Sequence, residues 1–443
     1  MKKKIAGIAV CLFWALLLCG CGSQTVSSMY KIPKRSAEFN NLQVVIDETM
    51  TGLEYAAPVS GDNQQTVQMA DLDGDGEDEY LVYTRAASGA EKPLQILIFG
   101  LGEDEKYQLL DVISFNGANF EKIEYVDVDG LPGKEIVVGR RQNNQLMRIV
   151  SVYSLASGRA NQIMSAIYTK YLTCDLDVDG KYEVMIIRRG ESESNHAAAV
   201  RYEYVDGIVE RSKEVELSES LDNIKRIVVS SLHGGQPAVF VSSAVNQSAI
   251  ITDIFTLKGK EFSNISLANE SGPSVQTLRN YYVFAEDVDA DGELELPALI
   301  PTKPIGVLKG TEKQYLLRWY APDLNGEETT KLYSYHDFEG GWYLQLDTEW
   351  ARETVVEQKG NTFSFYIWSE NYQEATSAFT IFAFTGNDRD VQAGIENRFA
   401  LLRGEHVTYA AKLETGSALY GITQEYLTEN FHRIRNNWKY GET

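Results

Sequence analysis

A nine-residue acidic pattern occurs four times in the chain and constrains its fold more than any other feature. All four copies carry carboxylates at the first, third and ninth positions, and three of them add an aspartate at the fifth position and a glycine at the sixth. Hard oxygen ligands at alternate positions around a tight turn are what calcium binds in proteins. The four copies begin at Asp71, Asp127, Asp175 and Asp287.

The EF-hand is the nearest alternative to this pattern. Its last acidic ligand lies six residues after the glycine, and its loop lies between two helices. In this chain that twelfth position is Val82, Val138, Ile186 or Ala298. The closing acid stands instead at the ninth position and leads into short β-branched or aromatic runs that are typical of strands. Each copy is therefore predicted to be a calcium loop that enters a strand.

These loops resemble the FG-GAP or VCBS repeats of integrin-like β-propellers. The resemblance implies structural Ca²⁺ held by the loop carboxylates and by the backbone carbonyl of the seventh residue. The second loop has Leu131 and Pro132 where the family has Asp and Gly, so we expect it to fill only at high calcium or not at all. Acidic turns that stay solvated without metal are the alternative. The implied metal-site residues are Asp71, Asp73, Asp75, Glu77 and Glu79, then Asp127, Asp129 and Glu135, then Asp175, Asp177, Asp179, Lys181 and Glu183, and finally Asp287, Asp289, Asp291, Glu293 and Glu295.

The spacing of the repeats indicates a further unit without carboxylates. The interval from the third copy to the fourth is twice that from the first to the second. A hidden unit is therefore expected near residue 231, where 227–241 reads as strand, glycine turn and strand. Repeats of several short strands predict a mainly β fold, a β-propeller of five to seven blades over residues 36–345, entered by a short helix at 36–50. Further strands are predicted at 94–99, 149–154, 200–204, 250–256 and 315–320.

After residue 345 the pattern changes, and residues 346–443 are predicted to form a small α+β domain. Strands are expected at 362–368, 378–384 and 406–413, with a helix at 388–398. Thr423 is expected to be the N-cap of a last helix. The side chains that this helix should bury are Leu427, Phe431, Ile434 and Trp438.

Residues 1–20 read as a lipoprotein signal peptide. Three lysines precede an apolar run over 5–18, and the segment ends in Leu18-Cys19-Gly20-Cys21, which resembles a lipobox. The resemblance implies that Cys21 is diacylated, becomes the mature N-terminus and anchors the protein to the extracytoplasmic face of the bacterial cell membrane, with 21–35 as a tether. A transmembrane anchor is the alternative, but the apolar run is shorter than the roughly 20 residues needed to span a bilayer.

The charge of the chain disfavours several classes of partner. Its 63 acidic and 41 basic residues give a formal net charge of −22, which argues against nucleic acid and anionic lipid surfaces. The sequence has neither a phosphate-cradling glycine loop nor a dinucleotide fingerprint, so no nucleotide is expected. After processing, Cys174 is left as a single thiol next to an acidic loop, and a buried structural role is predicted for it.

No catalytic motif is visible in the sequence. The five histidines are dispersed without metal-ligand spacing, and G-x-S-x-G is absent. The leading interpretation is a non-catalytic, calcium-stabilised surface lipoprotein that binds or scaffolds an envelope protein or a glycan. A purely structural role in an envelope complex is hard to separate from it. The alternative is a carbohydrate-active enzyme. The resemblance implies a polysaccharide lyase, because some calcium-loop propellers are lyases, and paired carboxylates that flank a sugar ring would suit a glycoside hydrolase.

Overall fold

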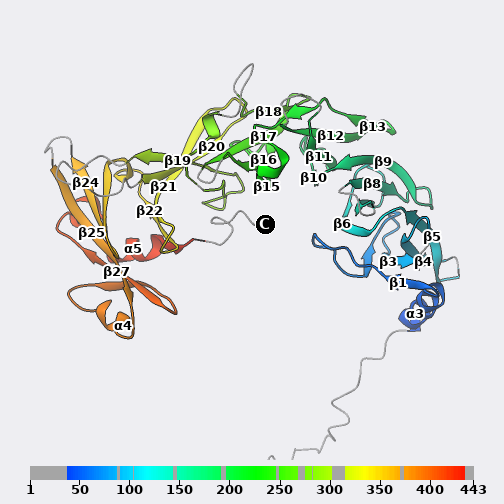
Figure 1. Cartoon of the computed structure of the whole chain (residues 1–443), viewed down its shortest axis with the longest axis horizontal. Helices are drawn as coiled ribbons and strands as arrows, with labels where there is room; N and C mark the ends of the chain where they lie inside the picture. The colour runs from blue at the N-terminus through cyan, green and yellow to red at the C-terminus, as the bar shows by residue number, and fades with distance from the viewer. Residues whose placement is uncertain are drawn as a thin grey trace, which may run out of the picture.

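In the part of the chain that the structure describes, six antiparallel β-sheets follow one another and make the fold mainly β, as predicted. Figure 1 shows them along an open arc, with the first and last sheets at its two ends. The described residues do not close a ring, so the number of propeller blades stays a prediction. The computed structural model describes residues 37–434 except 87–89, 103, 143–146, 191–195, 246–248, 268–274, 282, 302–314 and 370–373.

We number the sheets 1 to 6 in chain order. Sheet 1 contains β1 (Leu53–Tyr55), β2 (Val67–Ala70), β3 (Glu79–Ala86), β4 (Leu94–Leu101) and β5 (Tyr107–Phe115). Sheet 2 contains β6 (Asn119–Val126), β7 (Glu135–Arg141), β8 (Arg148–Ser154) and β9 (Asn161–Tyr168). Sheet 3 contains β10 (Lys170–Cys174), β11 (Glu183–Arg189), β12 (Ala197–Val205), β13 (Ile208–Arg211) and β14 (Val215–Glu216).

The remaining sheets follow the same antiparallel plan. Sheet 4 contains β15 (Ile224–Ser231), β16 (Pro237–Ala244), β17 (Ile250–Lys258) and β18 (Glu261–Asn264). Sheet 5 contains β19 (Leu296–Pro301), β20 (Tyr315–Pro322), β21 (Glu328–Asp337), β22 (Trp342–Leu346) and β28 (Phe431–Arg433). Sheet 6 contains β23 (Thr354–Lys359), β24 (Thr362–Ser369), β25 (Glu374–Thr385), β26 (Phe399–Arg403) and β27 (Val407–Leu413).

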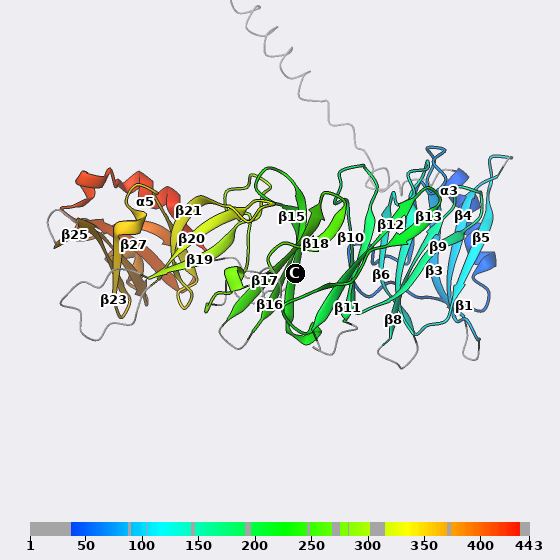
Figure 2. The ribbon, with the colours of Figure 1, turned by 90° about the horizontal axis from the view of Figure 1, so that it is seen from above.

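Neighbouring sheets pack face to face, and Figure 2 shows them in a row from α3 (Ala37–Thr49) to β25. Strand β11 illustrates the packing. Val184 and Ile186 are buried against valines of sheet 2, while Met185 and Ile187 are buried against Val239 and its neighbours in sheet 4. Because both faces of this sheet are covered, its central strand is a continuous apolar run instead of an alternating one.

The unit expected near residue 231 is present as sheet 4. Its strands β15 and β16 are joined by a short turn that includes Gly234 and Gly235, both with positive φ. The turn has no carboxylate of its own, as predicted from the sequence. The five further strands predicted from the apolar runs are also confirmed, as β4, β8, β12, β17 and β20.

The N-terminal helix is confirmed as α3, which covers the outer face of sheet 1. Leu42 and Ile46 lie against Val82, Leu97 and Phe99 in one buried cluster. These two helix residues are four apart and therefore lie on the same face. The helix closes this end of the row of sheets.

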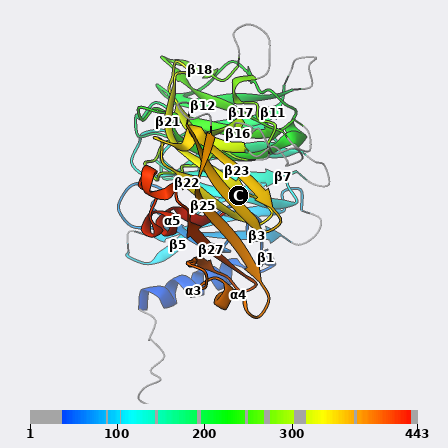
Figure 3. The same cartoon turned by 90° about the vertical axis from the view of Figure 1, so that its left-hand side faces the viewer.

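The C-terminal region differs from its prediction in three places. The helix expected over 388–398 is only α4 (Arg389–Gln392), and the unpredicted strand β26 follows it. The last helix, α5 (Gln424–Asn430), is capped by Thr423 as predicted but ends earlier. Phe431 leaves the helix because it starts β28, where it pairs with Leu344 of β22. Figure 3 shows α5 beside β22 and β27. Trp438 lies outside the described residues.

One apolar core runs through the predicted domain boundary at residue 345. Tyr335 and Trp342 of sheet 5 belong to the same buried cluster as Phe363 and Phe365 of sheet 6. The rings of Trp342 and Phe363 are 5.0 Å apart, and those of Tyr335 and Phe365 are 5.3 Å apart. Sheets 5 and 6 therefore pack on each other through one shared apolar core.

The predicted signal peptide, Cys21 and the tether lie outside the described residues. Among the helices that the structure describes, none is long and apolar enough to cross a membrane. Cys174 is buried at the end of β10, and burial raises the pKa of its thiol. This agrees with the structural role expected for it.

Candidate metal loops

The acidic segments occupy matching places in their sheets. We call them loop 1 (71–79), loop 2 (127–135), loop 3 (175–183) and loop 4 (287–295). Loops 1, 2 and 3 connect β2 to β3, β6 to β7 and β10 to β11. Loop 4 precedes β19, and its flanks pair through a bridge between Glu286 and Glu295. Each loop therefore turns the chain into a strand, as the sequence predicts.

Backbone hydrogen bonds join consecutive loops. The N–H of Lys134 in loop 2 donates to the carbonyl of Asp71 in loop 1 (3.1 Å), and the N–H of Tyr182 in loop 3 donates to the carbonyl of Asp127 (2.7 Å). Both donors are eighth residues and both acceptors are first residues. In loop 4, which precedes sheet 5, the eighth residue Leu294 donates its N–H to the carbonyl of Ser231 (2.9 Å), the last residue of β15 in sheet 4. The loops therefore form a series along one edge of the arc.

The closing glutamate of each loop is buried under the turn. Glu79, Glu135, Glu183 and Glu295 are each at most 4% exposed. In all four loops one carboxylate oxygen accepts the N–H of the second loop residue, at 2.8 Å from Leu72, 2.6 Å from Val128, 2.9 Å from Leu176 and 2.9 Å from Val288.

The first aspartate of each loop is held by the turn itself. Asp71 accepts N–H groups from Gly74 (2.7 Å) and Gly76 (3.2 Å). Asp175 accepts the corresponding N–H groups of Val178 (2.7 Å) and Gly180 (3.0 Å). The backbone of the turn thus fixes the orientation of this side chain.

The loops gather three carboxylates each. The oxygens of each trio lie within 4.8 Å of one another. Calcium bonds oxygens at about 2.3 to 2.6 Å, so one ion can contact oxygens spaced in this way. The trios are Asp71, Asp73 and Glu79; Asp127, Asp129 and Glu135; Asp175, Asp177 and Asp179; and Asp287, Asp289 and Asp291.

The other residues expected at these sites lie at the margins of the trios. Glu77, Lys181 and Glu293 are the seventh residues, and each donates its backbone N–H to the fifth-position aspartate. In loop 1 this acceptor is Asp75, which lies outside the trio of that loop. Loop 2 has Leu131 at that position, and Ser154 donates a hydrogen bond to Asp129 (2.9 Å).

The closing glutamates ionise less readily than free glutamate. Burial raises the pKa of Glu79, Glu135, Glu183 and Glu295 to about 7, and the hydrogen bond from the second loop residue offsets part of the shift. The neighbouring aspartates of loops 1 and 4 raise these values further. A cation placed among the carboxylates would reduce this repulsion.

The fourth loop position has a left-handed backbone in every loop. Glycine holds it in loops 1 and 2, but Val178 (φ 61°) and Ala290 (φ 62°) hold it in loops 3 and 4. A β-branched residue rarely adopts positive φ because its Cβ meets the following carbonyl oxygen. The turn geometry is therefore kept in loop 3 despite an unfavourable side chain.

We expect Val178→Gly to stabilise the protein by about 0.5 to 1 kcal/mol, because the release of left-handed strain exceeds the added chain entropy of glycine. Urea unfolding would measure the change. Val229, a second exposed valine but in the extended strand β15, provides the matched control. Val229→Gly should destabilise, and a loss of stability in both variants would contradict the strain in loop 3.

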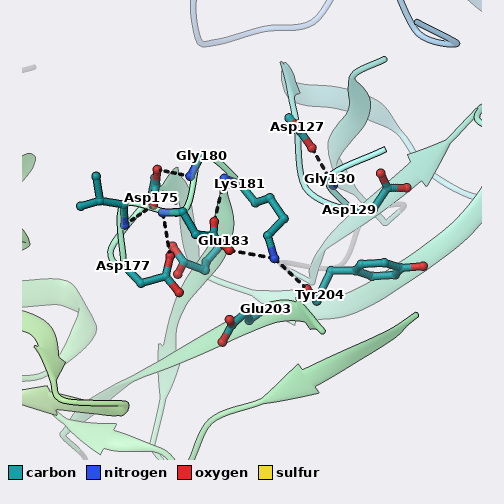
Figure 4. A network of polar contacts seen from close by, with 12 residues as sticks. Asp127, Asp129, Gly130, Asp175, Asp177, Gly180, Lys181, Glu183, Glu203 and Tyr204 are labelled. Carbon is teal, nitrogen blue, oxygen red and sulfur yellow. Dashed lines mark hydrogen bonds and ion pairs between the residues drawn. The ribbon is translucent and has the colours of Figure 1, made fainter. Parts of the chain in front are cut away.

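Among the described residues, lysine and arginine side chains pair with carboxylates of loops 3 and 4, and two of them, Arg201 and Lys331, were not expected from the sequence. Lys181 of loop 3 pairs with Asp179 (2.8 Å). Its Nζ also reaches the carbonyl of Tyr204 (3.5 Å), as Figure 4 shows. Arg201 of β12 contacts Glu183, and Lys331 of β21 contacts Asp291. Arg201 and Lys331 lie on later strands, so only the strand register could have revealed them.

Comparisons with known proteins do not identify a family. No protein-family model matches the chain, and no curated protein matches it. Among solved structures, a rhamnogalacturonan lyase of Bacillus licheniformis is 11% identical, with 73% of this chain and 72% of that chain covered and a TM-score of 0.28. TolB from Acinetobacter baumannii is 12% identical over 77% and 69% of the two chains, with a TM-score of 0.22. This similarity is too low to indicate a function, so the function has to be inferred from the residues of the loops.

Proposed function

We propose that this chain is a calcium-stabilised lipoprotein of the bacterial cell surface, in which FG-GAP/VCBS-like propeller blades form a non-catalytic scaffold for an envelope protein or a glycan. The observation that carries the proposal is the recurrence of one carboxylate loop at matching places in four sheets. A single acidic turn is common on protein surfaces. Four turns with the same buried glutamate and the same N–H donor at the second loop residue indicate a shared ligand.

Calcium is the ligand that these loops fit best. Every side chain in the four trios is a carboxylate, and hard oxygen donors favour calcium over zinc or copper. In loop 1 the ion would be held by Asp71, Asp73 and Glu79. In loop 4 the buried Oε1 of Glu295 has no hydrogen-bond partner among the described residues, so it is a further oxygen for a cation beside Asp287.

The hydrogen bonds that join consecutive loops support the proposal that the sheets are propeller blades. Sheets 1, 2, 3 and 5 place an acidic loop at the same strand entry, and sheet 4 places its glycine turn there. Calcium would fix each turn to the strand that follows it, and the hydrogen bonds from Lys134 and Tyr182 link each turn to the preceding loop. Its proposed role is structural.

Removal of calcium tests the proposal directly. Extracellular calcium modules bind at about 10⁻⁴ to 10⁻³ M, so millimolar calcium would add about 0.4 to 1.4 kcal/mol per filled site. We expect EDTA to lower the melting temperature by about 1 to 4 °C, with the room-temperature circular dichroism spectrum preserved. Asp73→Asn should reduce the effect. A melting curve that is indifferent to EDTA would refute the proposed calcium sites.

Lipidation at Cys21 would place the scaffold on the membrane. We expect the wild-type protein to incorporate labelled fatty acid and Cys21→Ser to lose the label, because acylation occurs on the sulfur. Cys174→Ser is the matched control, since that thiol is buried in the fold. Equal labelling of the Cys21→Ser protein would rule out the assignment.

The proposed envelope ligand can be identified with the lipidated protein in its native envelope. We expect affinity capture to recover an envelope protein or glycan, and incubation with polysaccharides to give no shortened products. Release of oligosaccharides by the wild-type protein would contradict the non-catalytic role and support the carbohydrate-active alternative.

A further inference from the structure

The closing glutamate of loop 3 is already bound by a cation of the protein. Arg201 Nη1 donates to Glu183 Oε1 at 2.8 Å, while Glu183 Oε2 accepts the N–H of Leu176 at 2.9 Å. The side chains of Arg201 and Glu183 are 10% and 3% exposed. Both oxygens of this carboxylate are therefore engaged inside the fold, and Glu203 pairs with the other end of the guanidinium.

Loop 3 is the only loop with a cation at this place in its sheet. Arg201 lies opposite Met185, the second residue after the closing glutamate. The same register gives Ile98 opposite Leu81 in sheet 1. In sheets 2 and 5 the corresponding residues are Val152, opposite Val137, and Trp319, opposite Pro297.

The negative charge of Asp179, an exposed carboxylate of loop 3, is also balanced by a cation of the protein. Lys181 pairs with Asp179 at 2.8 Å and reaches the carbonyl of Tyr204. Loop 1 contrasts with it, because the charged neighbours of Glu79 are the carboxylates of Asp71, Asp73 and Asp75. Loop 4 is intermediate in its charge balance, because Lys331 forms ion pairs with Asp291 and with Glu293 (2.8 Å).

We infer that Arg201 and Lys181 take the place of calcium in loop 3, so that the chain binds calcium in loop 1 but not in loop 3. The inference rests on the proposed calcium function and corrects its simplest form, in which every complete acidic loop fills. A divalent ion in loop 3 would meet a buried guanidinium and a glutamate without a free oxygen. Two protein cations instead give the loop the charge balance that calcium gives elsewhere.

Two matched variants test this difference. Asp73 and Asp177 are the third residues of loops 1 and 3, and both are exposed, so asparagine at either position leaves the core intact. Native mass spectrometry of the full chain in calcium would count bound ions. We expect Asp73→Asn to lose one ion relative to wild type and Asp177→Asn to lose none. Loss of one ion from Asp177→Asn would overturn the inference while leaving the proposed function in place.

Replacement of the guanidinium gives the converse test. Arg201→Ile copies the residue of sheet 1 and leaves Glu183 buried without its cation, which should destabilise the protein in EDTA. We expect calcium to raise the melting temperature of this variant more than that of wild type, and the added rise to vanish in Arg201→Ile/Asp177→Asn. An equal calcium response in Arg201→Ile and wild type would overturn the inference. Absence of calcium from wild type itself would refute the proposed function and with it the contrast between loops.

Discussion

Trp342→Ala is expected to lower the free energy of unfolding by about 3 to 5 kcal/mol, the usual cost of removing a large buried aromatic side chain. The indole is fully buried, and its ring lies 4.9 Å from that of Phe431 and 5.0 Å from that of Phe363. Its Nε1 also donates to Asp337 at 2.8 Å. One substitution therefore removes contacts to both sheet 5 and sheet 6.

Urea unfolding followed by tryptophan-independent circular dichroism would measure this cost. Val391 in α4 is 65% exposed, so Val391→Ala is a control at the same end of the molecule and should change stability by less than about 0.5 kcal/mol. We expect sheets 5 and 6 to unfold together in the Trp342→Ala protein. A cost below about 1 kcal/mol would contradict a continuous core at residue 345.

Acid is expected to weaken the protein through His336. This side chain is buried beside Phe338 and Tyr343, and burial lowers its pKa from 6.5 to about 3. The folded state therefore holds the neutral ring, whereas the unfolded chain takes up a proton below pH 6.5. The stabilising contribution is complete above pH 6.5 and is lost as the pH falls toward 3, at up to about 1.4 kcal/mol per pH unit.

The difference between wild type and His336→Gln isolates this contribution from the carboxylates. Between pH 7 and pH 4.5 we expect wild type to lose about 2 to 3 kcal/mol more than the variant. His406→Gln, at an exposed position, should follow wild type at both pH values. Parallel pH profiles for wild type and His336→Gln would show that His336 is not held neutral in the folded protein.

Part of this fold could be predicted from the sequence, because it depends on residues that are close together in the chain. The acidic loops, the glycine turn near residue 231 and the N-cap at Thr423 each depend on residues close together in the chain, and the structure has all of them. Strands β4, β8, β12, β17 and β20 could be predicted because short apolar runs lie between turn residues. The loop trios followed from the same local pattern.

Contacts between distant residues could not be read in the same way. Phe431 continues the helical apolar spacing of Leu427, and only its pairing with Leu344 makes it a strand residue. In the sequence, Arg201 is one charged residue among the short apolar and aromatic residues of β12, and only the strand register places it beside Glu183. Whether the sheets close into a ring depends on the sum of the small rotations between neighbouring sheets. No local sequence pattern determines that sum.

The most direct test of calcium in these loops is an anomalous difference map from crystals of the protein grown in millimolar calcium. The account predicts a peak within bonding distance of Asp71, Asp73 and Glu79 in loop 1, and its absence from crystals soaked in EDTA. The same map would show whether loop 3 is left without a peak beside Arg201. A map with no peak in any of the four loops would contradict the account and leave them as solvated acidic turns.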